Sequence, residues 1–432
     1  QGDDTEQQVQ QHLQAAITAF GERGGLDTAI AEGKAALELD ADNPDAHALL
    51  ALLYMQRFEW QAVELEAASA IDSKPDHAAA HSFLSQALRE QGDYDGALAR
   101  ADQAIQLDSE LSLGYTARAL VRQQGADENF DPNLLAEALT DAEQAIQLSG
   151  DEESYNQVEA YAAKASILAS RYNFTNDPND LQQAIEEYRQ AIGGHVQLAW
   201  HYASLGNILA TAGRYEDAEQ AFAAAIDRDP DLYATYEGRG WMLYQQQYYD
   251  TAIEQFSKAI DLTQDHPIGS IFRGRGLAHQ YNAFVEGKDK TAELRAARAD
   301  LERATDIDPY EPWFWSDLGG VLQDSGAPFV SGAFDRAIEL FNQDLERNNS
   351  NASAHEGIGW AQRRLQHLDQ ALEAFNNALA ANSKQSGAYL GKAYVQYEQD
   401  LKDDACSTLA TGLGELPENQ QLLQGKQDLE CQ

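Results

Sequence analysis

A 34-residue interval is the feature of this sequence that most constrains its fold. Equivalent positions of one pattern recur at that spacing in three stretches, occupied by Ala36, Ala70 and Ala104; by Ala191, Ala225 and Ala259; and by Asp344, Ala378 and Gly412. Periods of this length are typical of repeat architectures, in which each unit buries its apolar face only against its neighbours. A length of 432 residues would otherwise suggest two to four domains. The repetition indicates instead one continuous stack of repeats.

Residues 198–231 show the pattern of one unit. Two short amphipathic helices flank a turn at Gly213, and Pro230 marks the exit. Small residues stand where two helices must touch, and large apolar residues fill the space between them. The small positions are Gly206, Ala218 and Ala225, and the large ones are Tyr202, Leu205, Leu209, Tyr215 and Phe222.

This arrangement resembles the tetratricopeptide repeat, a 34-residue helix–turn–helix unit. The resemblance extends over essentially the whole chain. It implies an all-α fold, a right-handed α-solenoid of about eleven repeats closed by a C-terminal capping helix. We expect a flexible arm at residues 1–8, the solenoid at 9–418 and the capping helix at 419–432.

Four intervals are longer than 34 residues. They measure 41, 46, 45 and 40 residues, and we place the additional residues between helices near 125–133, 173–180, 284–290 and 326–332. The first two segments are rich in Asp and Asn, which is typical of loops. Insertions in repeat proteins commonly lie on one face, and that face is often functional.

The charge of the chain excludes two classes of partner. The sequence has 71 acidic and 30 basic residues, a formal net charge of −41. This surface repels nucleic acid phosphates and anionic membranes, and no run of eighteen apolar residues indicates a membrane span. We interpret the acid excess as a solvated surface suited to salty surroundings. The alternative is an assembly surface that depends on counter-ions or Ca²⁺.

No motif for catalysis is present. The sequence lacks the glycine-rich phosphate loop, the dinucleotide fingerprint, the H-E-x-x-H metal motif and the G-x-S-x-G elbow. His77 and His81 are four residues apart, but they straddle a repeat boundary and we interpret them as packed histidines. We therefore predict no enzyme activity, no catalytic residues and no cofactor.

Two acidic segments are weak candidates for Ca²⁺. Asp127 with Asp131, and Asp177 with Asp180, offer the clustered oxygen ligands that hard cations prefer. Neither segment follows the D-x-[DN]-x-[DN]-G calcium loop, and Asp- and Asn-rich turns explain both without an ion.

The resemblance places function on a concave groove lined by the first helix of each repeat, which in this family usually holds an extended peptide or a partner helix. The residues expected there are Trp200, Asn207, Trp241, Arg273, Trp313, Trp360 and Arg363. The Lys, Arg and Asn set that holds a peptide carboxylate in some members is absent. Tryptophan with interspersed arginine suits an apolar or Pro-rich ligand. The alternative is that each indole packs between adjacent helices and only narrows the groove.

Two cysteines, Cys406 and Cys431, bear on the compartment. A disulfide between them would close a loop of about 25 residues and stabilise the C-terminal end by roughly 3 kcal/mol. The capping helix should pack on the helix that holds Cys406, which makes the pairing plausible. The disulfide, together with a start at Gln1 that has neither Met nor an apolar leader, favours an exported or extracellular protein. A cytoplasmic protein of a salt-adapted organism is the alternative.

Two functions follow. The first is a non-enzymatic scaffold that binds a protein or peptide in its aromatic groove. The second is a structural subunit that assembles head-to-tail with other copies of itself into an extracellular filament or ring, because contact between different ends of a solenoid is heterologous. Bridging cations would have to offset the 41 excess negative charges in that case.

Overall fold

The structure is a computed structural model that describes residues 2–22, 24–129, 131–150, 154–193, 198–417 and 419–431. Helices occupy most of these residues, and no strand occurs in them. The all-α fold expected from the sequence is confirmed.

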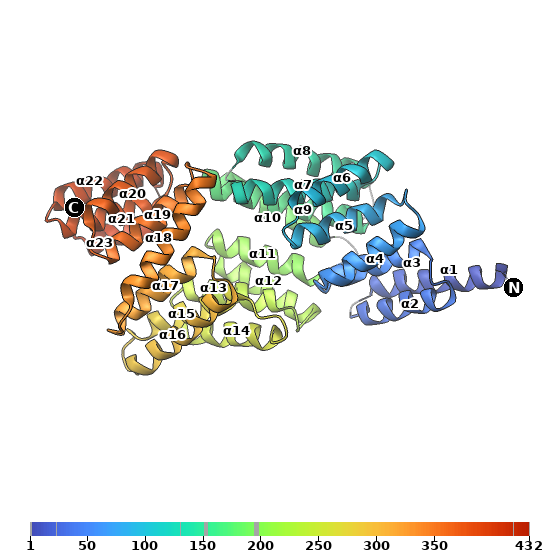
Figure 1. Cartoon of the computed structure of the whole chain (residues 1–432), viewed down its shortest axis with the longest axis horizontal. Helices are drawn as coiled ribbons and strands as arrows, with labels where there is room; N and C mark the ends of the chain where they lie inside the picture. The colour runs from blue at the N-terminus through green and yellow to red at the C-terminus, as the bar shows by residue number, and fades with distance from the viewer. Residues whose placement is uncertain are drawn as a thin grey trace. The chain divides into compact units, whose positions relative to one another are not determined.

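The chain divides into two compact units, Gln1–Thr235 and Tyr236–Gln432. The repeat spacing did not predict this division. Twelve helices lie wholly in the part of the first unit that the structure describes. Figure 1 labels them. They are α1 Gly2–Phe20, α2 Leu26–Leu39, α3 Pro44–Met55, α4 Trp60–Ser73, α5 Ala78–Glu90, α6 Tyr94–Leu107, α7 Ser112–Asn129, α8 Pro132–Leu148, α9 Tyr155–Thr175, α10 Pro178–Gly193, α11 Ala199–Thr211 and α12 Tyr215–Arg228.

The second unit begins within α13, which covers Tyr233–Gln245. Among the described residues of this unit, ten further helices follow in chain order, and Figure 1 labels them. They are α14 Tyr249–Leu262, α15 Gly269–Asn282, α16 Lys290–Ile307, α17 Pro312–Asp324, α18 Val330–Arg347, α19 Ala352–Arg364, α20 Leu368–Ala381, α21 Ser386–Glu398, α22 Lys402–Glu415 and α23 Gln420–Asp428.

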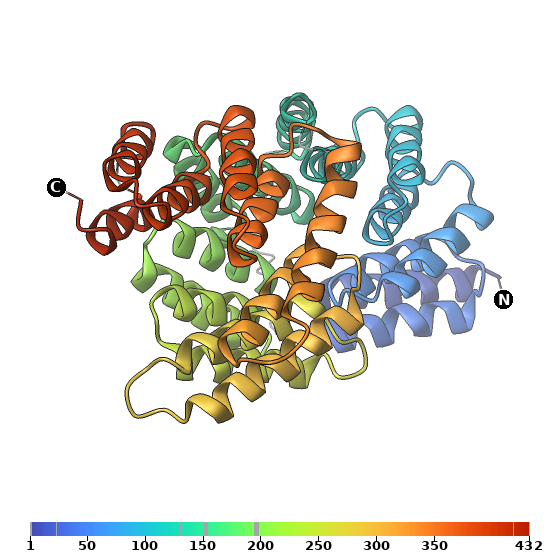
Figure 2. The ribbon, with the colours of Figure 1, turned by 60° about the vertical axis from the view of Figure 1, so that its left-hand side comes forward.

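Consecutive helices form pairs, α1 with α2, α3 with α4 and onward to α21 with α22. The pair α13 with α14 is shown by Phe256, which packs on Gly240 and Trp241. Within each unit the pairs follow one another in chain order (Figures 1 and 2). The described residues hold eleven such pairs, and α23 stands alone against α21 and α22. The predicted eleven repeats and single capping helix are therefore confirmed.

The first helices of the pairs form the inner layer of each unit. In the first unit α1 contacts α3, α3 contacts α5, α5 contacts α7 and α7 contacts α9; in the second, α15 contacts α17, α17 contacts α19 and α19 contacts α21. Successive second helices have no comparable contact among the described residues. Successive first helices therefore lie closer to one another than successive second helices do.

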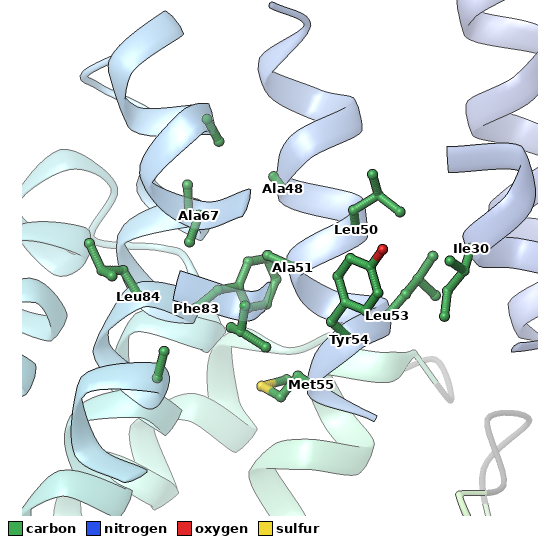
Figure 3. Packing of buried hydrophobic residues seen from close by; sticks show 14 of the residues in the cluster. Ile30, Ala48, Leu50, Ala51, Leu53, Tyr54, Met55, Ala67, Phe83 and Leu84 are labelled. Atoms are coloured by element: carbon green, nitrogen blue, oxygen red, sulfur yellow. The ribbon is translucent and has the colours of Figure 1, made fainter. Parts of the chain in front are cut away.

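The repeated alanines mark the closest approach of helices. Ala36, Ala70 and Ala104 are completely buried. Figure 3 shows the neighbouring large side chains that fill the space, with Leu50 and Leu53 of α3 and Phe83 of α5 packed between the helices. The 34-residue interval thus reflects one packing contact repeated from pair to pair.

Glycines in the first helices make room for phenylalanines of the second helices. Phe375 of α20 lies against Gly359 of its own pair and Gly391 of the next; a Cβ atom there would lie 2.6 Å and 2.2 Å from the ring. Phe256 of α14 lies in the same way between Gly240 and Gly274. At these two places a fully buried ring lies against glycines of two successive first helices and couples one helix pair to the next.

Two of the four expected loops are largely helical. α7 continues to Asn129, and α9 continues to Thr175, so the additional residues lengthen helices instead of forming loops. In the first insertion the burial of Ala126 explains the difference, since it packs with Leu135 of α8 in one apolar cluster. The other two insertions are connections, between α15 and α16 and between α17 and α18, as expected.

The N-terminal end of the chain differs from the expected structure, and the C-terminal end agrees with it. α1 begins at Gly2, so residues 2–8, expected to form an arm before the first helix, are its first turns. At the other end, Asn419 caps α23 by accepting a hydrogen bond from the Leu422 N–H. The Sγ atoms of Cys406 and Cys431 are bonded at 1.94 Å, with Cα atoms 5.4 Å apart. This bond ties the end of the capping helix to α22.

Candidate partner-binding surface

Three tryptophans of the second unit, Trp241, Trp313 and Trp360, stand edge-on to phenylalanines of their own helix pairs. Each indole is half-buried, so it packs within its repeat and still presents part of its surface. The ring centroids are 5.3 Å apart for Trp241 and Phe256, 5.1 Å for Trp313 and Phe341, and 5.4 Å for Trp360 and Phe375. The sequence left two alternatives for these residues, packing between helices and exposure on the surface. Each of the three indoles shows both.

Trp241 belongs to a larger group of rings, which we call the repeat-seven cluster: Trp241, Tyr244, Tyr249 and Tyr281. Tyr244 contacts the other three, with centroids 5.7 to 5.8 Å apart, and Tyr249 stacks on Tyr281 at 5.9 Å. Three helices, α13, α14 and α15, contribute to it. Burial, with the nearby Tyr281 and Asp317, raises the pKa of the Tyr244 phenol, so that ring stays neutral at ordinary pH.

The outer side of this cluster is open. Tyr281 is 49% exposed, and Phe284 and Val285, which follow it in the next turn, are 57% and 41% exposed. The Phe284 N–H donates to the Tyr281 carbonyl, which holds that turn in place. An apolar surface thus continues from the inner layer to the end of α15.

Arg273 is placed beside the repeat-seven cluster by an ion pair. Its guanidinium carbon lies 5.8 Å from the Trp241 ring centre, and its Nε donates to Asp317 at 2.6 Å. Burial lowers the pKa of Arg273, but the adjacent Asp317 carboxylate more than offsets this, and the pKa is raised overall. The guanidinium is therefore a fixed cation with its charge already balanced.

A second group combines a tryptophan, an arginine and a tyrosine, and we call it the repeat-ten cluster: Trp360, Arg363 and Tyr394. The Arg363 guanidinium lies 5.6 Å from the Trp360 ring centre and 5.0 Å from that of Tyr394, within cation–π range of both. It also donates to Glu398 at 2.6 Å. The cluster joins α19 and α21, two successive first helices.

Two glutamates that the sequence analysis missed orient the indoles. Trp360 Nε1 donates to Glu356 at 3.2 Å, and Gln385 of the next repeat donates to the same carboxylate at 2.6 Å. Glu237 accepts a bond from Ser270 at 2.8 Å. Burial raises the pKa of both carboxyl groups. The string Glu-Gly-x-Gly-Trp, which occurs at 237–241 and again at 356–360, is the signal that could have revealed them.

Trp200 and Asn207 lie in the first unit and so do not join these clusters. The Trp200 ring tilts onto His201, with centroids 3.7 Å apart, and packs on the apolar core between α11 and α12. Asn207 is exposed. The single row of aligned residues expected from the sequence is therefore divided between two units.

The weak calcium candidates have protein partners. Asp180 is buried and accepts bonds from Arg171 and from Thr175, whose Oγ1 lies 3.0 Å away. Asp131 caps α8, and Asp177 accepts two bonds from Asn179. Asp127 accepts a bond from Ser170 at 2.9 Å. No group of three or more His, Cys, Asp or Glu side chains in the described part of the chain is arranged to hold a metal.

The paired histidines have structural partners. His77 caps α5 by accepting from the Ala80 N–H, and His81 bonds the Pro75 carbonyl at 3.0 Å. Burial lowers the pKa of His81.

Among the described residues, none of the helices has the length and apolar character needed to cross a bilayer.

Paired helices stacked in units, with aromatic side chains on the inner helices, define an α-solenoid of the kind that presents binding surfaces. The sequence pattern of the family described as tetratricopeptide repeat matches residues 61–111, 204–267 and 357–419. The chain is a tetratricopeptide repeat protein.

Relatives agree with this assignment. Tetratricopeptide repeat protein 16 of Macaca fascicularis is 24% identical over 355 residues, 79% of this chain and 40% of that protein. Bovine neutrophil cytosol factor 2 is 30% identical over 98 residues, 23% of this chain and 18% of that protein. The chain thus spans less than half the length of these curated relatives. The human IFIT1 dimer with PPP-AAAA has a TM-score of 0.51 at 14% identity, covering 89% of each chain, a likeness of fold alone.

Proposed function

We propose that this chain is a non-enzymatic scaffold whose second unit binds an extended, Pro-rich or apolar segment of a partner protein. The observation that carries the proposal is the repeat-seven cluster, four contacting rings from three helices with a half-exposed Tyr281 at the edge. Protein binding is the general activity of tetratricopeptide repeat scaffolds. The choice of ligand rests on the chemistry of the cluster.

Aromatic-lined surfaces suit proline-rich segments for two reasons. The polyproline II helix is already ordered before binding, so little conformational entropy is lost. Proline rings pack flat on aromatic faces, and tyrosine hydroxyls can donate to the carbonyl groups that the segment leaves unpaired. Trp241, Tyr244 and Tyr281 supply both kinds of contact.

The repeat-ten cluster offers a second contact of the same kind on the same unit. Arg363 lies between two rings and its charge is balanced by Glu398. A partner that spanned both clusters would bind more tightly than either alone, because the second contact is intramolecular. RNA is a poor candidate for either cluster, since a net charge of −41 repels phosphates.

The test is selection of random twelve-residue peptides on the full chain, with the Tyr281→Ala variant as counter-selection. Peptides rich in proline and apolar residues should be enriched on the unaltered protein and lost on the variant. Tyr310→Ala is the matched control, because Tyr310 is 72% exposed in the same unit but outside the cluster. Enrichment that survives Tyr281→Ala would overturn the proposal. Concentration-dependent growth into filaments or rings would favour the self-assembling alternative instead.

We also propose that the chain works in an oxidising compartment, outside the cell or in an exported location. The support is the Cys406–Cys431 bond at the end of the capping helix. Mass spectrometry of protein taken from its native source under thiol-blocking conditions tests this. Recovery of both cysteines as blocked free thiols would contradict it.

A further inference from the structure

The first unit contains a cleft that the proposed function does not use. It has a volume of about 710 Å³ and lies where the turns α1–α2 and α3–α4 meet the start of α11 and the connection α12–α13. Phe58, in the α3–α4 turn, closes one side by packing edge-on to Tyr233, with centroids 6.5 Å apart. A residue of the second repeat is thereby brought against the first helix of the seventh. The volume is in the range of ordinary ligand sites.

The backbone at Phe58 is strained, as it is at Gln247, Gln366 and Asp400, which hold the same turn position in later repeats. Phe58 has φ of 58°, and the corresponding turn positions of the first and third repeats are glycines, Gly24 and Gly92. A bulky residue in the left-handed region costs of order 1 kcal/mol or more. Here the conformation directs an aromatic ring to the cleft wall, beside Trp60 at 5.9 Å.

The walls combine aromatic faces with excess negative charge. Phe58, Trp200 and Tyr233 are among four aromatic residues that line the cleft, together with five carboxylates and two arginines. Both arginines are already engaged. Arg57 pairs with Asp27, and Arg228 stacks on the Tyr202 ring at 3.8 Å while donating to its hydroxyl at 2.8 Å.

One wall also carries a buried acceptor without a donor. Gln56 donates through Nε2 to the Tyr155 hydroxyl at 3.3 Å, but its Oε1 atom is buried with no hydrogen-bond partner among the described residues. An unpaired buried acceptor is costly, which makes this wall a locally unfavourable arrangement. The occupant of the cleft is indicated by the aromatic faces and the exposed carboxylates, and both favour a cation with N–H donors.

We propose that this cleft binds a basic segment of a partner protein, with an arginine or lysine side chain flanked by an apolar residue. The cationic group would lie against the Trp200 and Tyr233 rings and form ion pairs with the exposed carboxylates of Glu22 and Asp231. The apolar neighbour would pack on Phe58. The site is separate in residues and in ligand charge from the surface proposed for the second unit.

The test is fluorescence anisotropy of a labelled peptide, Ala-Arg-Leu-Arg-Leu-Ala with blocked ends, titrated with the full chain. The Glu22→Gln/Asp231→Asn double variant should raise the dissociation constant about tenfold, because two attractive charges are lost with little change of shape. Glu38→Gln/Asp72→Asn is the control, since it removes two exposed carboxylates from the far ends of α2 and α4. The control should leave the affinity unchanged.

Each of the following results would overturn the proposal. An equal loss of affinity in both double variants would indicate a general effect of the acidic surface. Equal binding of a citrulline-substituted peptide, or no binding at millimolar protein, would also contradict it. Photo-crosslinking of the bound peptide to Trp200 or Tyr233 is the expected outcome on the unaltered chain. Crosslinks confined to the second unit would also count against the proposal.

Discussion

The indole of Trp360 stands edge-on to the ring of Phe375, with centroids 5.4 Å apart and planes at 80°. Trp241 and Phe256 repeat the relationship at 5.3 Å and 79°. Each phenylalanine is completely buried between two glycine-bearing helices, so its position is fixed, and the indole resting on it is fixed as well. The packing of each repeat therefore orients the aromatic side chains proposed to bind a partner.

Gly391→Ala should destabilise the second unit by about 1 to 3 kcal/mol, because the added Cβ would lie 2.2 Å from the Phe375 ring in a core without room to relax. Urea denaturation measures the change. Gly414→Ala is the control, since a Cβ there meets no atom within 4 Å and alanine is the better helix former. Equal stability of the two variants would show that the ring is not confined as described.

Asp141→Ala should cost about 2 to 3 kcal/mol in the first unit. Asp141 is buried and accepts bonds from Arg118 at 2.7 Å and Arg122 at 2.5 Å, so its removal leaves two partly buried cations without their partner. Asp102→Ala removes an exposed carboxylate from the same Arg118 and should cost less than about 1 kcal/mol. Similar losses in the two variants, measured by denaturation, would contradict this assignment.

Replacing both cysteines by serine should lower the unfolding free energy by about 3 kcal/mol, because the bond closes a loop with a sequence separation of 25 residues. Hydrogen exchange should localise the loss to α22 and α23. A reducing agent should have the same effect on the unaltered chain and none on the variant. Unchanged exchange in α23 after reduction would mean that packing of Leu422 alone holds the capping helix.

The buried glutamates predict a pH dependence. Burial raises the folded-state pKa of Glu356 above its ordinary value of 4.5, and that of Glu237 likewise. Between the ordinary and the raised pKa the folded state binds more protons than the unfolded state, so stability falls as pH rises through this window and is then constant. The Glu237→Gln/Glu356→Gln variant should lack this fall.

The measurement is urea denaturation of both proteins at intervals from pH 4.5 to 7. Glu373→Gln, which removes an exposed carboxylate of the same unit, is the charge-matched control. An unaltered slope in the double variant would show that other groups cause the pH dependence.

Much of the fold could be predicted from the sequence because the decisive contacts are local. The 34-residue spacing of Ala36, Ala70 and Ala104 reports one helix-to-helix contact, and it repeats as long as the contact does. The insertion near residues 125–133 was predicted to be a loop because its composition is typical of turns. The burial of Ala126 stabilises a helix there instead.

The candidate surfaces were predictable only in part. Trp241 and Trp360 were identified from their repeat positions, but Tyr281 joins the cluster through contacts between neighbouring repeats that the pattern does not specify. The cleft of the first unit brings Phe58 to Tyr233. Periodicity predicts contacts between adjacent repeats and cannot reveal a contact between the second and the seventh.

The central claim is that the inner aromatic surface of the second unit binds an extended partner segment. The most direct test is the dissociation constant of a labelled proline-rich peptide for the unaltered chain, for Tyr281→Ala and for Tyr310→Ala. We predict saturable binding that weakens about tenfold or more in Tyr281→Ala, the loss typical of a contact-centre aromatic, and is unchanged in Tyr310→Ala. Equal affinity for all three proteins would contradict the account.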